Sequence, residues 1–189
     1  MSSLGNREKQ LLLALARRAL VLAVRNQESL KNLPDDEILQ QPGGAFVTLH
    51  HRGRLRGCVG QLPSRDTLAE VIAHCSKSAA LEDPRFAEVS AVELPGIEIE
   101  LSVLSAPIEV ALEQIQPGKH GLIVSSGWKR GVFLPQVAAQ FHWNAQQFLE
   151  ETCAKADLAR DAWKDPVTRV QAFTAEVFSE ADFPATLLK

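Results

Sequence analysis

The stretch "AFVTLHHRGRLRGCVGQL", residues 45–62, has the sequence pattern of a β-hairpin. Two runs that suit strands flank Arg52 and Gly53, and a glycine at this point supplies the backbone freedom that a tight turn requires. A short hairpin turn joins antiparallel strands, whereas parallel strands need a long crossover. The stretch therefore indicates an antiparallel sheet.

The rest of the chain interleaves further strands with helices. Residues 97–105, "IEIELSVLS", alternate apolar and polar side chains, which predicts a strand with one buried face. A second hairpin is predicted at "GWKRG", residues 127–131, and a last strand at 169–178. Helices are predicted at about 7–26, 67–80 and 144–158. This order predicts an α+β fold with a mainly antiparallel sheet and flanking helices.

Composition and charge narrow the class of protein. The chain has 189 residues, of which 46% are hydrophobic and 23% charged, as is usual for a folded domain. Its net charge of -3 gives no electrostatic reason to expect nucleic acid or an anionic membrane as a partner. The apolar run at residues 11–24 is interrupted by Arg17 and Arg18, so we interpret it as an amphipathic helix and not as a membrane span or signal peptide.

The three cysteines, Cys58, Cys75 and Cys153, lie far apart in the sequence. They form no CxxC pair and no Cys/His cluster with zinc spacing, so we expect no disulfide framework, no bound metal and a reducing, cytoplasmic location. The chain also lacks the glycine-rich dinucleotide and phosphate motifs and the HExxH motif. We therefore expect no cofactor.

The short segment around Cys58 suggests a reactive site. Period-two alternation in a strand places Arg56 and Cys58 on one face, and a guanidinium beside a thiol stabilises the nucleophilic thiolate. Gly57 and Gly60 are poor strand formers, and we interpret them as positions where a ligand or another chain segment approaches closely. The alternative is that Cys58 is a small buried apolar side chain, as most free cysteines are.

A thiol nucleophile also needs a group that exchanges protons. His120 lies between glycines at the start of a predicted strand, and Glu100 lies on the polar side of its strand. Their simpler interpretation is a solvent-exposed turn histidine and a solvated carboxylate. Asp83 and Arg85, in "EDPRF", are spaced to pair around a local turn. His50 and His51 lie in the Cys58 hairpin, but the sequence does not fix the register that would place them.

Six segments in this order resemble the AMMECR family, whose prokaryotic members include AmmeMemoRadiSam system protein A. The segments are "LRGCVGQL", "DPRF", "IEIELSVLS", "GKHGLIV", "GVFLPQVA" and "FLEETCAKADL". The resemblance extends from about Arg7 to Phe178, and it departs from the family pattern at Val59, where isoleucine is usual. It implies one AMMECR-type domain over residues 1–189, with a larger and a smaller lobe that are intertwined.

The resemblance also implies a site and partners. The family's proposed active region corresponds here to Arg56, Gly57, Cys58 and Gly60, with Asp83, Arg85, Glu100 and His120 as candidates to surround it. In name and gene context, the family is associated with a Memo-type protein and a radical S-adenosylmethionine protein. The resemblance implies no established reaction.

Two functions are compatible with these residues. In the first, the protein is a small-molecule enzyme in which Cys58 is the nucleophile, Arg56 stabilises its thiolate, and His120 or Glu100 moves protons. In the second, the protein is a non-catalytic binding module or scaffold. Arg56, Arg85 and the backbone amides of the glycines then hold a small anionic ligand or a segment of a partner protein.

Overall fold

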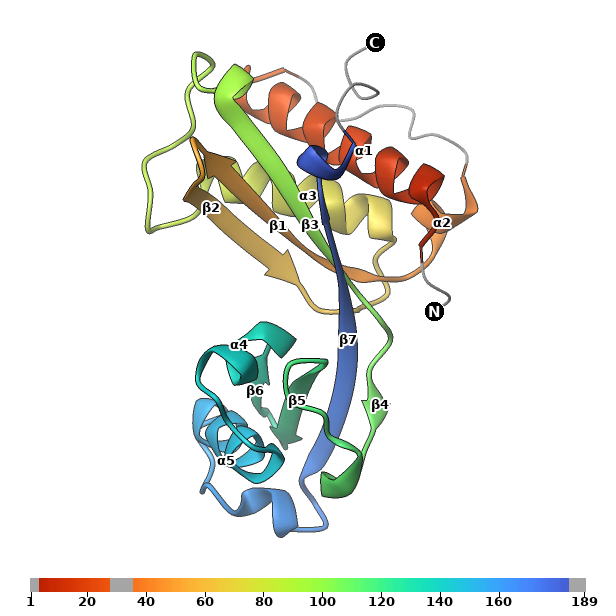
Figure 1. The fold of residues 1–189 in the computed structure, drawn as a ribbon, viewed down its shortest axis with the longest axis vertical. Coiled ribbons are helices and arrows are strands. Elements are labelled where there is room, and N and C mark those ends of the chain that lie inside the picture. The colour runs from red at the N-terminus through yellow and green to blue at the C-terminus, as the bar shows by residue number, and fades with distance from the viewer. Residues whose placement is uncertain (1–3, 28–35, 184–189) are drawn as a thin grey trace. The chain divides into compact units, whose positions relative to one another are not determined.

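The computed structural model describes residues 4–27 and 36–183, and its fold is α+β with mainly antiparallel strands, as predicted (Figure 1). The chain divides into two compact units. The first consists of Met1–Leu104 and Glu176–Lys189, and the second consists of Ser105–Ala175. The second unit is therefore an insertion into the sequence of the first.

The elements follow the sequence in this order. The first unit contains α1 (Asn6–Val24), α2 (Glu37–Gln40), β1 (Gly44–His51), β2 (Arg54–Gln61), α3 (Leu68–Leu81) and β3 (Ile97–Leu104). The second contains β4 (Ile108–Glu109), β5 (His120–Ser126), β6 (Lys129–Phe133), α4 (Pro135–Gln140) and α5 (Ala145–Lys155). The long strand β7 (Arg169–Ser179) begins in the second unit and ends in the first.

In the first unit, β1 is the central strand and pairs antiparallel with β2 and with β3. The predicted hairpin turn is confirmed: Arg52 and Gly53 both have positive φ angles, of 53° and 74°. The pairing of β1 with β2 shifts between Leu49 and His50, because Leu49 faces Gly57 while His50 faces Leu55. This β-bulge leaves Arg56 without an opposite residue on β1.

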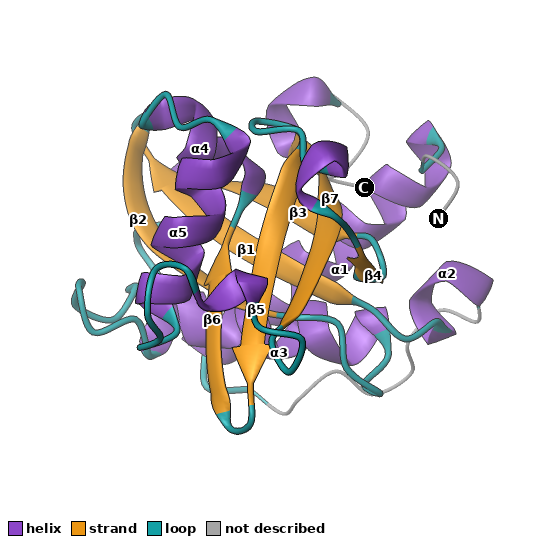
Figure 2. Cartoon of the chain, turned by 90° about the horizontal axis from the view of Figure 1, so that it is seen from below, coloured by secondary structure: helices purple, strands orange, loops and turns teal. Residues whose placement is uncertain are grey.

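One face of this sheet forms the main core. Ala45, Val47 and Leu49 of β1 are fully buried, and so are the predicted inward-facing residues of β3, which are Ile97, Ile99, Leu101 and Val103. Helices α1 and α3 pack together and contact the strands (Figure 2). Helix α3 begins with a capping box, in which Thr67 accepts the Glu70 N–H and Glu70 accepts the Thr67 N–H.

The second unit has its own sheet and core. Strand β5 lies between β6 and β7, and β4 pairs with β7. Leu122 and Val124 of β5 pack with Phe148, Leu149 and Cys153 of α5. The predicted second hairpin is confirmed. The short helix α4 was not predicted; a proline at its first position is favourable because that residue needs no hydrogen-bonded N–H.

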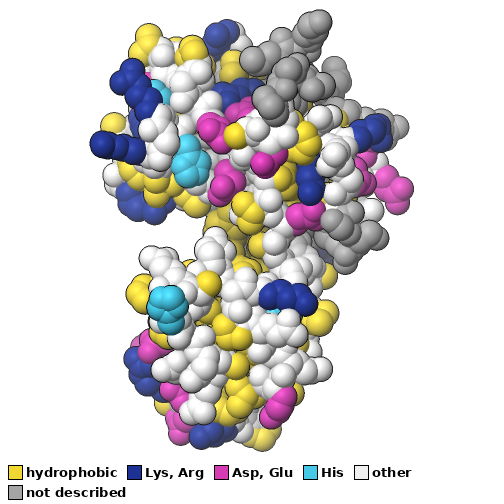
Figure 3. Space-filling view, in the orientation of Figure 1, with side chains coloured by type: hydrophobic (Ala, Val, Ile, Leu, Met, Phe, Trp, Pro, Cys, Tyr) yellow, Lys and Arg dark blue, Asp and Glu magenta, His cyan; other side chains and the backbone are white. Residues whose placement is uncertain are grey.

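The apolar run near the N-terminus forms helix α1, as expected. Arg17 is largely buried and binds the Glu180 carboxylate and the carbonyl oxygens of Leu94 and Ile97, all within the first unit. In residues 4–27 and 36–183, no helix is long and apolar enough to cross a membrane. On the face that Figure 3 shows, basic and acidic side chains are interspersed.

Candidate functional site

Cys58, Thr48 and Glu100 lie in one row across the neighbouring strands β2, β1 and β3. Thr48 on the central strand is opposite Cys58 of β2 on one side and opposite Glu100 of β3 on the other. The Thr48 hydroxyl donates to Cys58 Sγ, with 3.3 Å between Oγ1 and Sγ. Neighbouring strands lie 4.7–4.9 Å apart, so the backbones of Cys58 and Glu100 are separated by about 10 Å. The row therefore places a thiol, a hydroxyl and a carboxylate side by side.

This row lies on the face opposite the main core. Because side chains alternate along a strand, Thr48 and His50 lie on the side opposite Ala45, Val47 and Leu49. Cys58 is partly exposed. The other two thiols, of Cys75 and Cys153, are fully buried. Of the three cysteines, Cys58 is therefore the one that a dissolved reagent reaches most readily.

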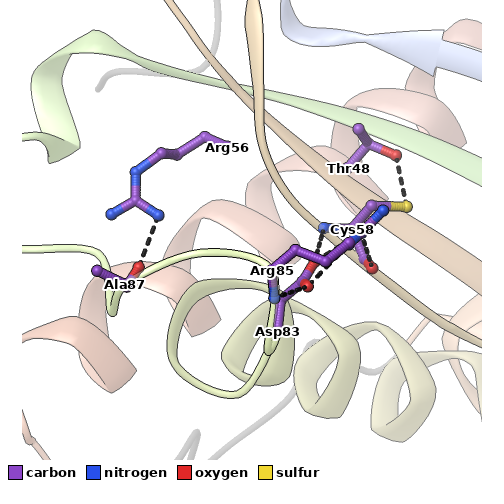
Figure 4. Close-up of polar contacts among 6 residues, drawn as sticks. All are labelled: Thr48, Arg56, Cys58, Asp83, Arg85 and Ala87. Carbon is purple, nitrogen blue, oxygen red and sulfur yellow. Dashed lines mark hydrogen bonds and ion pairs between the residues drawn. The ribbon is translucent and has the colours of Figure 1, made fainter.

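The outer edge of β2 is completed by two side chains from the loop that follows α3. The Cys58 N–H donates to Asp83 Oδ2 at 2.9 Å, and Arg85 Nη2 donates to the Cys58 carbonyl oxygen at 3.1 Å (Figure 4). Asp83 and Arg85 are themselves paired, at 2.7 Å. An edge strand leaves such backbone groups unpaired, so this ion pair takes the place of a neighbouring strand at Cys58.

Asp83 is well suited to this structural task. The residue is only 5% exposed, although the Arg85 side chain remains half exposed. Hydrogen bonds from the Arg85 guanidinium, together with the one from the Cys58 N–H, hold the pKa of Asp83 well below its usual range. The two residues predicted to surround the site thus hold the backbone of the candidate nucleophile.

Arg56 points away from Cys58 and binds the loop that precedes β3 (Figure 4). Its Nε donates to Glu93 at 2.8 Å, Nη1 donates to the Ala87 carbonyl at 2.7 Å, and Nη2 donates to the Glu88 carbonyl at 3.1 Å. Hydrogen bonds from Arg56 lower the pKa of Glu93 to about 2. The charge of Arg56 is therefore balanced within the first unit. Its hydrogen bonds anchor residues 87–93.

Gly57 and Gly60, which were predicted to allow a ligand or another chain segment to approach closely, are both packed against other parts of the protein. A Cβ atom at Gly57 would lie 2.0 Å from the Ala79 carbonyl oxygen, so helix α3 approaches β2 directly over this residue. A Cβ atom at Gly60 would lie 2.1 Å from the Phe46 ring, which covers this position from β1. The close approach expected at both glycines is made by the protein itself.

The predicted catalytic residues fall into two groups. Cys58 and Glu100 share the row described above, whereas His120 belongs to the second unit, at the start of β5. There His120 Nδ1 accepts the Gln116 N–H at 3.2 Å, and burial lowers the pKa of this histidine. Thr48 was not predicted as a site residue, because nothing in the sequence identifies the residue opposite Cys58.

Comparisons with known proteins agree with this fold. The sequence model of the AMMECR1 family matches residues 13–178. A protein of Methanothermobacter thermautotrophicus is 41% identical over 186 residues, covering 94% of this chain and 96% of the relative. A protein of Thermococcus gammatolerans is 40% identical over 184 residues, covering 90% and 89%.

A solved structure gives the same result. The crystal structure of an uncharacterised protein from Pyrococcus horikoshii is 36% identical, covers 90% of each chain and superposes with a TM-score of 0.74. The fold thus places the chain in a class of α+β proteins that includes archaeal relatives. The chain belongs to the AMMECR1 family.

Proposed function

We propose that the protein is a small-molecule enzyme that uses Cys58 as its nucleophile. The observation that carries the proposal is the hydrogen bond from the Thr48 hydroxyl to the partly exposed Cys58 sulfur. A donor aimed at sulfur stabilises the negative charge that the nucleophilic form bears. The ion pair of Asp83 and Arg85 supports this role, because it fixes the backbone on which the thiol is carried.

His50 is the proposed proton carrier. Glu100 lies in the same row as Cys58, and His50 lies two residues from Thr48 on the same side of β1. In the proposed step, the Cys58 thiol passes its proton to His50 as Sγ forms a bond to an electrophilic carbon of the substrate, and the leaving group departs with that proton from His50. Water then attacks the same carbon, so that a C–O bond forms, the S–C bond breaks and a proton from the water returns to the sulfur.

The ion pairs argue against the alternative of an anion-binding module. The two arginines that would hold an anion are both engaged, Arg56 with Glu93 and Arg85 with Asp83. The proposal includes cooperation with a Memo-type protein and a radical S-adenosylmethionine protein, which rests on the family resemblance alone. It also includes a cytoplasmic location, for which the three unpaired cysteines are the support.

Replacement of Thr48 by valine tests the proposed activation. Valine keeps the shape of threonine and suits a strand, but it removes the hydroxyl that donates to Sγ. We expect the rate of Cys58 alkylation by iodoacetamide at pH 7 to fall about tenfold, because a hydrogen bond to a charged group contributes about 1.5 kcal/mol or more. The rate is measured by mass spectrometry of the Cys58 peptide.

The matched control is Thr48→Ser, which keeps the hydroxyl and should retain most of the wild-type rate. Glu100→Gln should change the dependence of the rate on pH, because it removes a carboxylate charge from the row that contains the thiol. Thermal melting of each variant separates a local effect from a loss of fold. Equal rates for Thr48→Val and the wild type, with both folded, would show that this hydrogen bond does not activate Cys58.

A further inference from the structure

We infer that the substrate of the Cys58 row carries a protonated amine, which Glu100 binds while the reacting carbon lies against the thiol. The inference rests on the proposed function and names the class of substrate for the same site. It reverses the expectation of an anionic ligand, which the sequence suggested through the arginines near Cys58.

Strand β3 carries two carboxylates, those of Glu98 and Glu100. Glu98 and Glu100 alternate with the buried residues of this strand, so they lie on the same side of the sheet as Thr48. Within residues 4–27 and 36–183, neither carboxylate has an ion-pair or hydrogen-bond partner. Glu100 is also partly buried. Partial loss of hydration without a counter-ion is unfavourable for a carboxylate, and a bound cation offsets that cost.

Arg85 is neutralised by Asp83, and Arg56 is neutralised by Glu93, so each pair contributes no net charge. Glu98 and Glu100 are therefore two carboxylates on this side of β3 whose charge no ion pair among the described residues offsets. A negatively charged substrate is repelled there, and a positively charged one is attracted.

The spacing of the row indicates the size of the substrate. Thr48 lies between Cys58 and Glu100, and the two outer backbones are about 10 Å apart. An amine bound by Glu100 and a carbon in contact with Cys58 Sγ are therefore joined by a short linker and are not neighbours in the molecule. The class is a small amine with an electrophilic carbon several bonds from its nitrogen.

Charged thiol reagents test this charge preference directly. Three methanethiosulfonates are used, with a trimethylammonioethyl, a sulfonatoethyl or a methyl group, which are cationic, anionic and neutral. In each reaction the thiolate attacks the reagent's sulfenyl sulfur, an S–S bond forms, and methanesulfinate leaves with the electron pair. The rate at Cys58 is measured by mass spectrometry and divided by the rate at the same cysteine in the urea-unfolded chain.

We expect this normalised rate to be about five- to tenfold higher for the cationic than for the anionic reagent. Glu100→Gln should remove most of the preference and Glu98→Gln a smaller part. Glu37→Gln, which removes an equal charge from the exposed start of α2, should leave it unchanged.

The outcomes separate this inference from the proposed function. If the neutral reagent modifies Cys58 no faster than Cys75 or Cys153, the proposed function fails. If the neutral reagent modifies Cys58 readily but the anionic reagent is as fast as the cationic one after normalisation, the amine inference alone is overturned. A cation preference that survives in the Glu98→Gln, Glu100→Gln double variant likewise overturns the inference.

Discussion

Replacement of Asp83 by alanine should destabilise the first unit by about 2–4 kcal/mol at pH 7. The change removes the acceptor for the Cys58 N–H and leaves Arg85 without its carboxylate. Asp83 is almost fully buried, so water does not replace these bonds without a rearrangement of the loop. The half-exposed position of Arg85 keeps the expected loss below that of a fully buried pair. Urea unfolding and hydrogen exchange of peptides from β1 and β2 measure the effect.

The pH dependence of this effect has a definite sign. The pKa of Asp83 is lower in the folded protein than in the unfolded chain, so its contribution is present above the unfolded value of about 3.9. The difference in stability between the wild type and Asp83→Ala should therefore be largest at neutral pH and should shrink as the pH falls from about 5 toward 2. Glu109→Ala, which removes an exposed carboxylate paired with Arg169, is the control and should cost less than about 1 kcal/mol. A difference that grows on acidification would contradict this account.

Replacement of Gly57 by alanine should cost about 3 kcal/mol or more. The added methyl group would lie 2.0 Å from the Ala79 carbonyl oxygen, which belongs to the backbone of the last turn of α3. Helix α3 and strand β2 have to separate to make room for it. The free energy of unfolding, measured in urea and followed by far-ultraviolet circular dichroism, gives the size of the effect.

Gly60→Ala is the matched comparison on the same strand. Its methyl group meets the Phe46 side chain, which is able to turn aside, so the expected cost is smaller, about 1–2 kcal/mol. A larger loss of stability for Gly60→Ala than for Gly57→Ala would show that the close approach of α3 is not the reason why residue 57 is a glycine. A stable Gly57→Ala variant whose Cys58 no longer reacts would instead support the original interpretation of Gly57 as an opening for a ligand.

Local patterns in the sequence predicted the helices and strands of the first unit. They did not predict which residues on different elements contact one another. The hairpin turn at Arg52 and Gly53, the helix at about 67–80 and the alternation of β3 each depend on neighbours in sequence, and all three were confirmed. If the hairpin had no bulge, pairing β1 with β2 residue by residue from the turn would place Thr48 opposite Gly57. The bulge at Arg56 moves Thr48 to Cys58, and no local signal marks it.

The same bulge explains why the role of Arg56 was hard to predict. Regular alternation places Arg56 beside Cys58, but the contacts of its guanidinium depend on a loop more than thirty residues away in sequence. The interpretation of Asp83 and Arg85 as a local pair was confirmed, because their spacing determines it. Their attachment to the Cys58 backbone required the three-dimensional arrangement.

The central claim is that Cys58 is the reactive thiol of this protein, and competitive labelling of its three cysteines tests that claim most directly. Native protein is treated with iodoacetamide at pH 7, and each cysteine peptide is quantified over time, with the urea-unfolded chain as the reference. Burial raises the pKa of Cys75 to about 11 and also raises the pKa of Cys153. We therefore predict that Cys58 reacts at least about tenfold faster than either of them in the native protein. An unlabelled Cys58 beside a labelled Cys75 or Cys153 would contradict the account.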